Sequence, residues 1–213
     1  MHGIMLKRLG HNVHVLEQAG SERAGYAAGI TAMSDVQRFM ETHDLTAEKW
    51  FVESHDSQFI NKSGQPTKTM KKMMCMTSWS VLYHRLRANF DGFESVFVEK
   101  IPAPLESDGN VVFDEGQRVV NIRDVGDQVE VKFQDVKILQ EQTLLADLVI
   151  GADGSNSFVR QVMLPEVERQ YSGYIAFRGC VPQKEVSEET LRTLVDKLTM
   201  FFRKGSPKNY IVL

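Results

Sequence analysis

The sequence predicts a mixed α/β (α+β) fold, and three observations predict it. A short β-branched stretch, HNVHVLE, ends in the acid Glu17, as the second strand of a dinucleotide-binding unit does. A period-two pattern over residues 118–133 indicates an antiparallel hairpin. An apolar run, residues 144–150, leads into the glycine-rich segment GADGSNSFVR. We therefore expect an incomplete Rossmann-like domain with a three-stranded β excursion, plus the first strands of a second, β-sheet domain.

The first half of the chain is expected to mix helices and strands. Apolar residues recur at helical spacing from Met1 to Leu9, and Gly10 ends that helix. Val36, Phe39 and Met40 share one face of a further helix, and Ser78 can cap another. We expect helices at residues 1–9, 34–43 and 79–89, a strand ending at Glu17, and a strand, turn and strand over 57–77.

The second half is expected to be richer in strands. The hairpin turns at residues 126–127, and the run 144–150 is expected to pair beside it as a buried strand before it reaches Gly151. After Arg160 we expect four elements: an extended segment at 171–181, a helix over 185–198, and strands near 200–203 and 210–213.

The segment GADGSNSFVR, residues 151–160, has the composition of a nucleotide-binding turn. Gly151 and Gly154 remove side chains where a ligand's backbone must approach closely, and Asp153 offers a carboxylate that accepts hydrogen bonds from ribose hydroxyls. Backbone N–H groups at a helix start also favour a neighbouring anion. The alternative is a plain strand-to-helix turn in which Ser155 or Ser157 is the N-cap.

Glu17 is a second candidate for nucleotide binding. At the end of a buried strand its carboxylate would accept from both ribose hydroxyls of an adenosine; the alternative is a surface acid at a strand end. The glycine fingerprint of such a unit lies about 20 residues before this acid. Only sixteen residues precede Glu17, and they lack its glycine spacing. The chain is therefore expected to be an internal piece of a longer protein, or to start at an internal methionine.

Three segments resemble one enzyme family. ADLVIGADGSNSFVR is similar to the aspartate-glycine motif of the FAD-dependent aromatic hydroxylases, the p-hydroxybenzoate hydroxylase superfamily. TSWSVLYHRLRANFDG, residues 77–92, and YSGYIAFRGCVP, residues 171–182, resemble its 2,6-dihydroxypyridine 3-monooxygenase-like branch. All three matches fall in the family's order along the chain.

The resemblance implies a function and a set of cofactor residues. It implies a fragment of an FAD-dependent monooxygenase that hydroxylates a small aromatic or N-heteroaromatic substrate, with NADH or NADPH as co-substrate and oxygen. The flavin performs the chemistry, so no side chain is assigned as the catalyst. The alternative is a catalytically inactive nucleotide-binding or interaction fragment. With Glu17, the cofactor-binding candidates are Arg23, which resembles the family's arginine near the FAD pyrophosphate, and Asp153, Gly154, Ser157 and Arg160.

The resemblance also divides the chain into domains and suggests a substrate site. Residues 1–168 would be the incomplete FAD-binding domain, with 57–77 contributing to the substrate domain, and 169–213 the beginning of that substrate domain. In the strand GYIAFRG, Tyr174 and Arg178 lie on one face, and the arginine suits an anionic phenolate or pyridinolate. The alternative is a solvent-facing arginine on a half-buried strand.

Composition excludes several other classes of function. A net charge of −3 argues against nucleic acid as the main partner. Lys7 and Arg8 interrupt the N-terminal apolar stretch, which excludes a signal peptide or membrane span there. The two cysteines have no paired spacing, so a reducing, cytoplasmic location is expected. His11 and His14 lie on opposite faces of a strand, and no metal site is expected.

Overall fold

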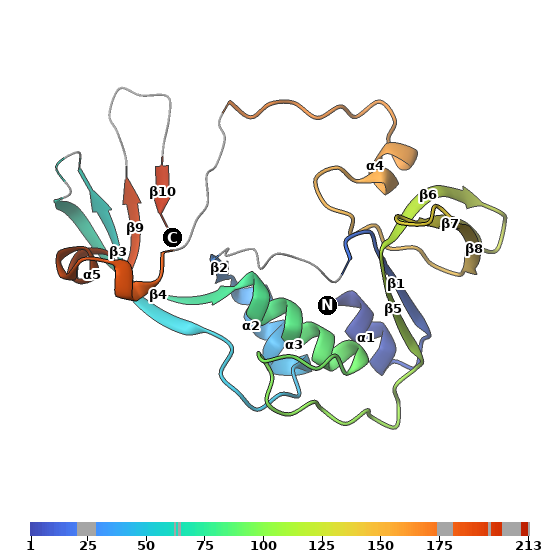
Figure 1. The fold of residues 1–213 in the computed structure, drawn as a ribbon, viewed down its shortest axis with the longest axis horizontal. Coiled ribbons are helices and arrows are strands. Elements are labelled where there is room, and N and C mark those ends of the chain that lie inside the picture. Colours follow the sequence, from blue (N-terminus) through green and yellow to red (C-terminus); the bar gives the residue numbers. More distant parts are fainter. Residues whose placement is uncertain are drawn as a thin grey trace. The chain divides into compact units, whose positions relative to one another are not determined.

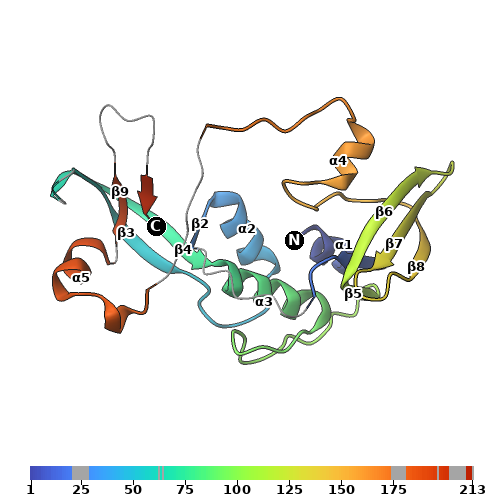
Figure 2. The same cartoon turned by 45° about the horizontal axis from the view of Figure 1, so that its top comes forward.

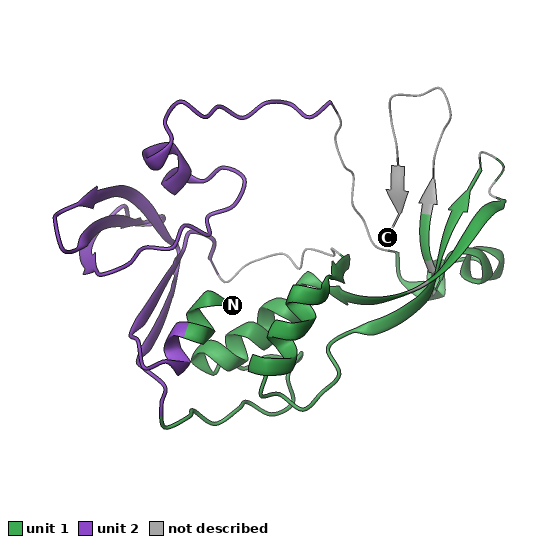
Figure 3. Ribbon diagram, turned by 180° about the vertical axis from the view of Figure 1, so that it is seen from behind, with its two compact units in different colours: residues 1–5, 25–106, 174–213 green, residues 6–24, 107–173 purple. Residues whose placement is uncertain are grey.

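The computed structural model describes residues 1–20, 29–61, 63, 65–173, 181–195, 197–201 and 210–212. The chain divides into two compact units, each assembled from segments that are distant in sequence (Figure 3). Unit 1 contains residues 1–5, 25–106 and 174–213, and unit 2 contains residues 6–24 and 107–173. The mixed α/β fold is confirmed, whereas the predicted division of the chain at residue 168 stays a prediction.

Unit 1 contains a five-stranded sheet in the order β10–β9–β3–β4–β2 (Figure 1). The predicted strand, turn and strand are present as the long antiparallel pair β3 (Val52–Ile60) and β4 (Pro66–Ser78). β2 (Gly29–Ala32) pairs with β4, β9 (Lys197–Phe201) runs parallel to β3, and β10 (Tyr210–Val212) is antiparallel to β9. Strands from both ends of the sequence therefore form one sheet.

Two of the predicted helices belong to unit 1. α2 (Ser34–His43) has the predicted bounds and buries Met40. α3 (Trp79–Asp91) follows β4 directly, because the Ser78 side chain accepts a hydrogen bond from the Val81 N–H and caps the helix. It runs two residues further than predicted and ends at Gly92, whose φ of 72° is left-handed.

The N-terminal helix, α1 (His2–Arg8), is confirmed and spans residues of both units. Gly10 follows it with a φ of +85°. Its expected apolar face is only partly buried, since Ile4 is buried while Met1, Met5 and Leu9 are exposed. No helix in the described part of the chain is long and apolar enough to cross a membrane.

A polar cluster connects the segment after α2 to α3: the buried residues Arg85 and Asn89 of α3 contact the half-buried residues Asp44 and Glu48. The Arg85 Nε donates to Asp44 Oδ2 at 2.9 Å, and Arg85 Nη1 lies 3.5 Å from Glu48 Oε2. Asn89 Nδ2 donates to Asp44 Oδ1 at 2.8 Å. Arg85 is 1% exposed, so its charge is compensated by carboxylates rather than by water. The cluster positions α3, which continues directly from β4.

We expect Arg85→Ala to lower the free energy of unfolding by about 3–5 kcal/mol, because Asp44 would keep a buried charge without its partner. Arg38→Ala is the matched control, since Arg38 pairs with Asp35 on α2 at 3.4 Å and its side chain is 75% exposed. Urea denaturation followed by circular dichroism measures both variants. Equal stability of the two variants would show that the Arg85 cluster contributes nothing specific.

Unit 2 combines a parallel strand pair (Figure 1) with a three-stranded antiparallel sheet (Figure 2). β1 (Val13–Glu17), which was predicted, runs parallel to β5 (Val111–Glu115), which was not. The predicted β excursion is confirmed as β6 (Gln117–Asp124), β7 (Val129–Asp135) and β8 (Glu141–Ala146). Val131 and Phe133 on β7 are each 4% exposed and form the core of this sheet. β6 contacts both β1 and the short helix α4 (Phe158–Met163).

The second half of the strand predicted over residues 144–150 is wrong. β8 ends at Ala146, and residues 148–150 are not in a strand. Leu148 is 65% and Ile150 45% exposed. An apolar run forms a buried parallel strand only where neighbouring strands complete its backbone hydrogen bonds, and within the described residues no strand pairs with 148–150.

The helix predicted over residues 185–198 is also wrong in its bounds. A 3₁₀ turn at Gln183–Glu185 precedes α5 (Glu188–Leu194), which begins after Ser187 because that side chain accepts from the Thr190 N–H. Residues 197 and 198 belong to β9, where pairing with β3 overrides the local helical pattern. Most of the extended segment expected at 171–181 lies outside the described residues.

Candidate functional site

The predicted nucleotide-binding turn connects β8 to α4, and Gly151 is packed against that helix. A Cβ added at Gly151 would lie 2.9 Å from both Cβ and Cγ1 of Val159. The missing side chain therefore allows the loop to approach α4, rather than only a ligand as predicted. Gly154 has a φ of +78° and open space around its Cα, so glycine is favoured there by backbone conformation.

Asp153 is held by hydrogen bonds from the beginning of α4. The Ser157 hydroxyl donates to Asp153 Oδ1, and the Val159 N–H donates to Oδ2 at 3.1 Å. Ser157 in turn accepts from the Arg160 N–H at 2.9 Å and is the N-cap of α4. Ser157 therefore acts as the predicted alternative N-cap, and its hydroxyl also joins the helix start to the Asp153 carboxylate.

The Asp153 carboxylate is stabilised in its ionised form. Burial raises its pKa, but the hydrogen bonds from the Ser157 side chain and from backbone N–H groups outweigh that effect, so its pKa lies below the ordinary value of 3.8. The stabilisation from these hydrogen bonds is present above pH 3.8 and is lost as the pH falls through the pKa of the folded state. At neutral pH this carboxylate can only accept hydrogen bonds.

Arg160 is half-buried on the first turn of α4. Its Nη2 donates to the Ser155 carbonyl at 2.7 Å, so the guanidinium contacts the loop that precedes α4. A guanidinium has five N–H donors, so this contact leaves donors for an anionic ligand. A carboxylate acceptor and a cationic donor thus lie within one short segment.

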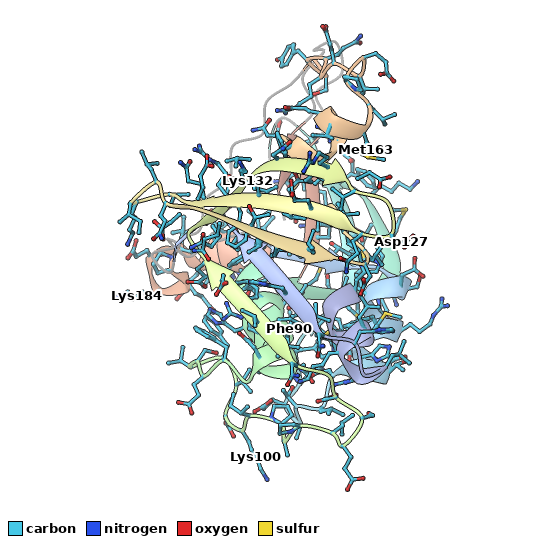
Figure 4. The ribbon with its side chains drawn as sticks, turned by 90° about the vertical axis from the view of Figure 1, so that its right-hand side faces the viewer. Phe90, Lys100, Asp127, Lys132, Met163 and Lys184 are labelled. Atoms are coloured by element: carbon cyan, nitrogen blue, oxygen red, sulfur yellow. The ribbon has the colours of Figure 1, made fainter. Side chains whose placement is uncertain are left out.

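A cavity of about 350 Å³ lies over this segment. It brings together four of the predicted cofactor residues, Asp153, Gly154, Ser157 and Arg160. Its remaining lining residues are Gly151 and three apolar side chains, Val159, Met163 and Leu164; Met163 is labelled at the end of α4 in Figure 4. Sequence reasoning missed the apolar wall, although the i, i+4 spacing of Val159 and Met163 could have indicated it.

The other predicted site residues are placed separately from this cavity or are not described. Glu17 ends β1 as predicted, is half-buried, and accepts the Ala19 N–H at 2.8 Å through Oε1. It is paired in register with Glu115 of β5 and does not line the cavity. Arg23, Tyr174 and Arg178 lie outside the described residues. Among the described residues, no group of three or more His, Cys, Asp or Glu side chains is arranged to hold a metal ion.

The chain belongs to the FAD binding domain family, whose model matches residues 1–176. A second model, for an FAD binding domain-like family, matches residues 171–213. Among curated proteins, the chain is 24% identical over 197 residues to 2,6-dihydroxypyridine 3-monooxygenase from Paenarthrobacter nicotinovorans, covering 92% of this chain and 44% of that protein. It is 27% identical to 6-hydroxynicotinate 3-monooxygenase from Pseudomonas fluorescens, covering 85% of this chain and 44% of that protein. The chain thus spans less than half the length of these relatives.

Solved structures show the same fold. The 2,6-dihydroxypyridine-3-hydroxylase from Arthrobacter nicotinovorans matches with a TM-score of 0.69 at 20% identity, covering 93% of this chain and 45% of that one. The p-nitrophenol 4-monooxygenase from Pseudomonas putida DLL-E4 matches with a TM-score of 0.54 at 18% identity, covering 74% of this chain and 39% of that one. The resemblance to flavin-dependent hydroxylases that the sequence indicated is confirmed.

We expect Gly151→Ala to displace α4 from its loop, because the added Cβ would contact Val159 at 2.9 Å. Amide hydrogen exchange of residues 160–163 should accelerate markedly. Gly20→Ala is the control: Gly20, like Gly151, has no left-handed φ, but a Cβ added there would have no atom within 4 Å. The contact is tested in a Val159→Gly background, which removes the Cβ as well as both Cγ atoms: Gly151→Ala should cause no further loss of protection there, and a further loss would show that the Gly151–Val159 contact is not the cause.

Proposed function

We propose that this chain is the cofactor-holding part of an FAD-dependent monooxygenase that hydroxylates a small aromatic or N-heteroaromatic compound, using NADH or NADPH and oxygen. The observation that carries the proposal is the cavity formed by Asp153, Gly154, Ser157 and Arg160 in a chain of the FAD binding domain family. The names of the relatives, which are monooxygenases of hydroxylated pyridines, support this substrate class.

The chemistry of the cavity suits one part of the cofactor. Asp153 is an ionised acceptor, so it matches a ribose or ribityl hydroxyl, whereas it would repel a phosphate. Arg160 offers the donors that a pyrophosphate oxygen requires, and Met163 and Leu164 supply an apolar wall. At the end of β1, Glu17 suits the hydroxyls of the adenosine ribose, and we assign Arg23 to the pyrophosphate on the basis of the family resemblance.

FAD, when bound, supplies the redox chemistry by taking electrons from the nicotinamide and activating oxygen. The residues of this chain bind and orient the cofactor, and none is assigned as a catalyst. We propose that residues 1–168 belong to the FAD-binding domain and 169–213 to the substrate domain, with 57–77 contributing to the latter. Arg178 and Tyr174 would then hold the anionic ring of the substrate. We retain the cytoplasm as the proposed location.

Asp153→Ala and Glu17→Ala should each weaken FAD binding by about 1.5–3 kcal/mol, the range for a hydrogen bond to a charged group. The Asp153 variant should also slow flavin reduction by NADH or NADPH. Asp147→Ala is the matched control. Asp147 lies on the same loop as Asp153 and accepts a hydrogen bond from the Gln128 side chain, but it does not line the cavity. Flavin fluorescence titration of a protein that carries residues 1–213 measures the dissociation constants. Unchanged affinity in both test variants would contradict the assigned cofactor contacts.

Arg178→Ala should raise the Michaelis constant for a hydroxylated pyridine or phenol, or uncouple nicotinamide oxidation from hydroxylation, because the substrate anion would lose its counter-charge. Arg178→Lys, which keeps the charge but not the planar fork, should show a smaller defect. Nicotinamide oxidation and product formation are measured together. Wild-type coupling and affinity in Arg178→Ala would place this arginine in solvent. If flavin is bound but no aromatic ligand stimulates turnover, the monooxygenase assignment itself is wrong.

A further inference from the structure

Ser157 differs from the other polar residues of the cavity because its hydroxyl is hydrogen-bonded to groups of the protein itself. The residue is 7% exposed, whereas Asp153 is exposed and Arg160 is half-buried. Its Oγ donates to Asp153 Oδ1 and accepts from the Arg160 N–H at 2.9 Å. A hydroxyl has a single proton. While that proton is donated to Asp153, Ser157 has none to donate to a ligand.

We propose that Ser157 is a positioning residue, which holds the Asp153 carboxylate in one orientation at the cavity so that it accepts a ligand hydroxyl. This role rests on the proposed function, because the ligand hydroxyl is taken to be that of the FAD ribose or ribityl chain. Ser157 then acts through Asp153 instead of contacting the cofactor itself.

Two hydrogen bonds fix the orientation of the carboxylate. Ser157 occupies one position on Oδ1, and the Val159 N–H occupies one on Oδ2 at 3.1 Å. The backbone N–H groups of Asp153 and Phe158 also lower the pKa of this carboxylate from the protein side, but Asp153 is exposed, so its solvent side can still accept a hydrogen bond. The Ser157 and Val159 donors both come from the start of α4, and the solvent side of the carboxylate therefore keeps a constant relation to Arg160 on the same turn. At the Asp153 carboxylate itself, the ligand group that fits is a hydroxyl donor and not an anion.

The same hydrogen bonds account for the direction of the Asp153 pKa, which lies below 3.8 with the Ser157 hydroxyl as the foremost lowering contribution. If Ser157 positions this carboxylate, removing its hydroxyl must change the titration of Asp153 even when no cofactor is present. A residue that merely caps α4 would not change that titration by itself. The pKa of Asp153 therefore separates the two roles.

Two substitutions divide the capping role from the positioning role. Ser157→Gly removes the hydroxyl but keeps an acceptable N-cap residue, so α4 should persist. Ser157→Thr keeps both the donor and the cap, and it is the rescue variant. Asp153→Asn serves as the reference for loss of the ionised acceptor. Amide exchange at residues 160–163 verifies that α4 is formed in each variant.

We expect NMR titration of the Asp153 carboxyl carbon, in the chain without flavin, to give a pKa raised by about one pH unit in Ser157→Gly and unchanged in Ser157→Thr. In fluorescence titrations, the dissociation constant for FAD should rise roughly fivefold in Ser157→Gly, by loss of about one hydrogen bond, and stay near wild type in Ser157→Thr. When the FAD affinity is measured against pH, the pH at which affinity is lost on acidification should rise in Ser157→Gly together with the Asp153 pKa.

An unchanged Asp153 pKa in Ser157→Gly would overturn the positioning role. So would an FAD affinity that falls in Asp153→Asn but not in Ser157→Gly. If the pKa rises as expected while neither Ser157→Gly nor Asp153→Asn affects FAD affinity, the contact between Asp153 and the cofactor in the proposed function is wrong, and the ligand part of this proposal is overturned with it. Failure of the inference and failure of the proposed function therefore give different results.

Discussion

The hydrogen bonds that Asp153 accepts from the start of α4 are the constraint on which the candidate site depends. They join the loop after β8 to the helix, fix the carboxylate in its ionised form, and place Arg160 on the same turn. Gly151 makes this connection possible, because any side chain there would contact Val159. The cavity lies between the loop and helix, so its polar and apolar linings both follow from one local arrangement.

The chain uses charged side chains in two contrasting ways. In unit 1, the side chains of Arg85 and Asp44 are buried and compensate one another, so they hold α3 in place but have little capacity left for a ligand. In unit 2, Asp153 is exposed and hydrogen-bonded on its protein side, which leaves acceptor positions facing outward. Exposure also means that solvent screens its charge, so its contribution lies in orientation more than in electrostatic energy. This difference distinguishes a structural ion pair from a site that can receive a hydroxyl.

Local patterns in the sequence predicted those elements that local forces decide. Ser78 marked the start of α3, the period-two pattern marked β6 and β7, and a single face of apolar residues marked α2. Elements that depend on remote partners were less predictable. The short strands β2 and β5 were missed because their partners, β4 and β1, are distant in sequence. Residues 148–150 were assigned to a strand on their apolar character alone, but pairing, not hydrophobicity, decides whether a strand forms.

The candidate site shows the same division between what sequence reveals and what packing decides. The motif identified Asp153, Gly154, Ser157 and Arg160, and the fold brings these four residues around one cavity. Sequence reasoning assigned Gly151 to close approach of a ligand, whereas its Cα faces Val159, because a motif does not show which neighbour occupies the space that a glycine leaves. It also gave Ser157 and Asp153 the same kind of role. Their burial separates them: an exposed carboxylate can meet a ligand, while a buried hydroxyl that already donates its proton can act only through that carboxylate.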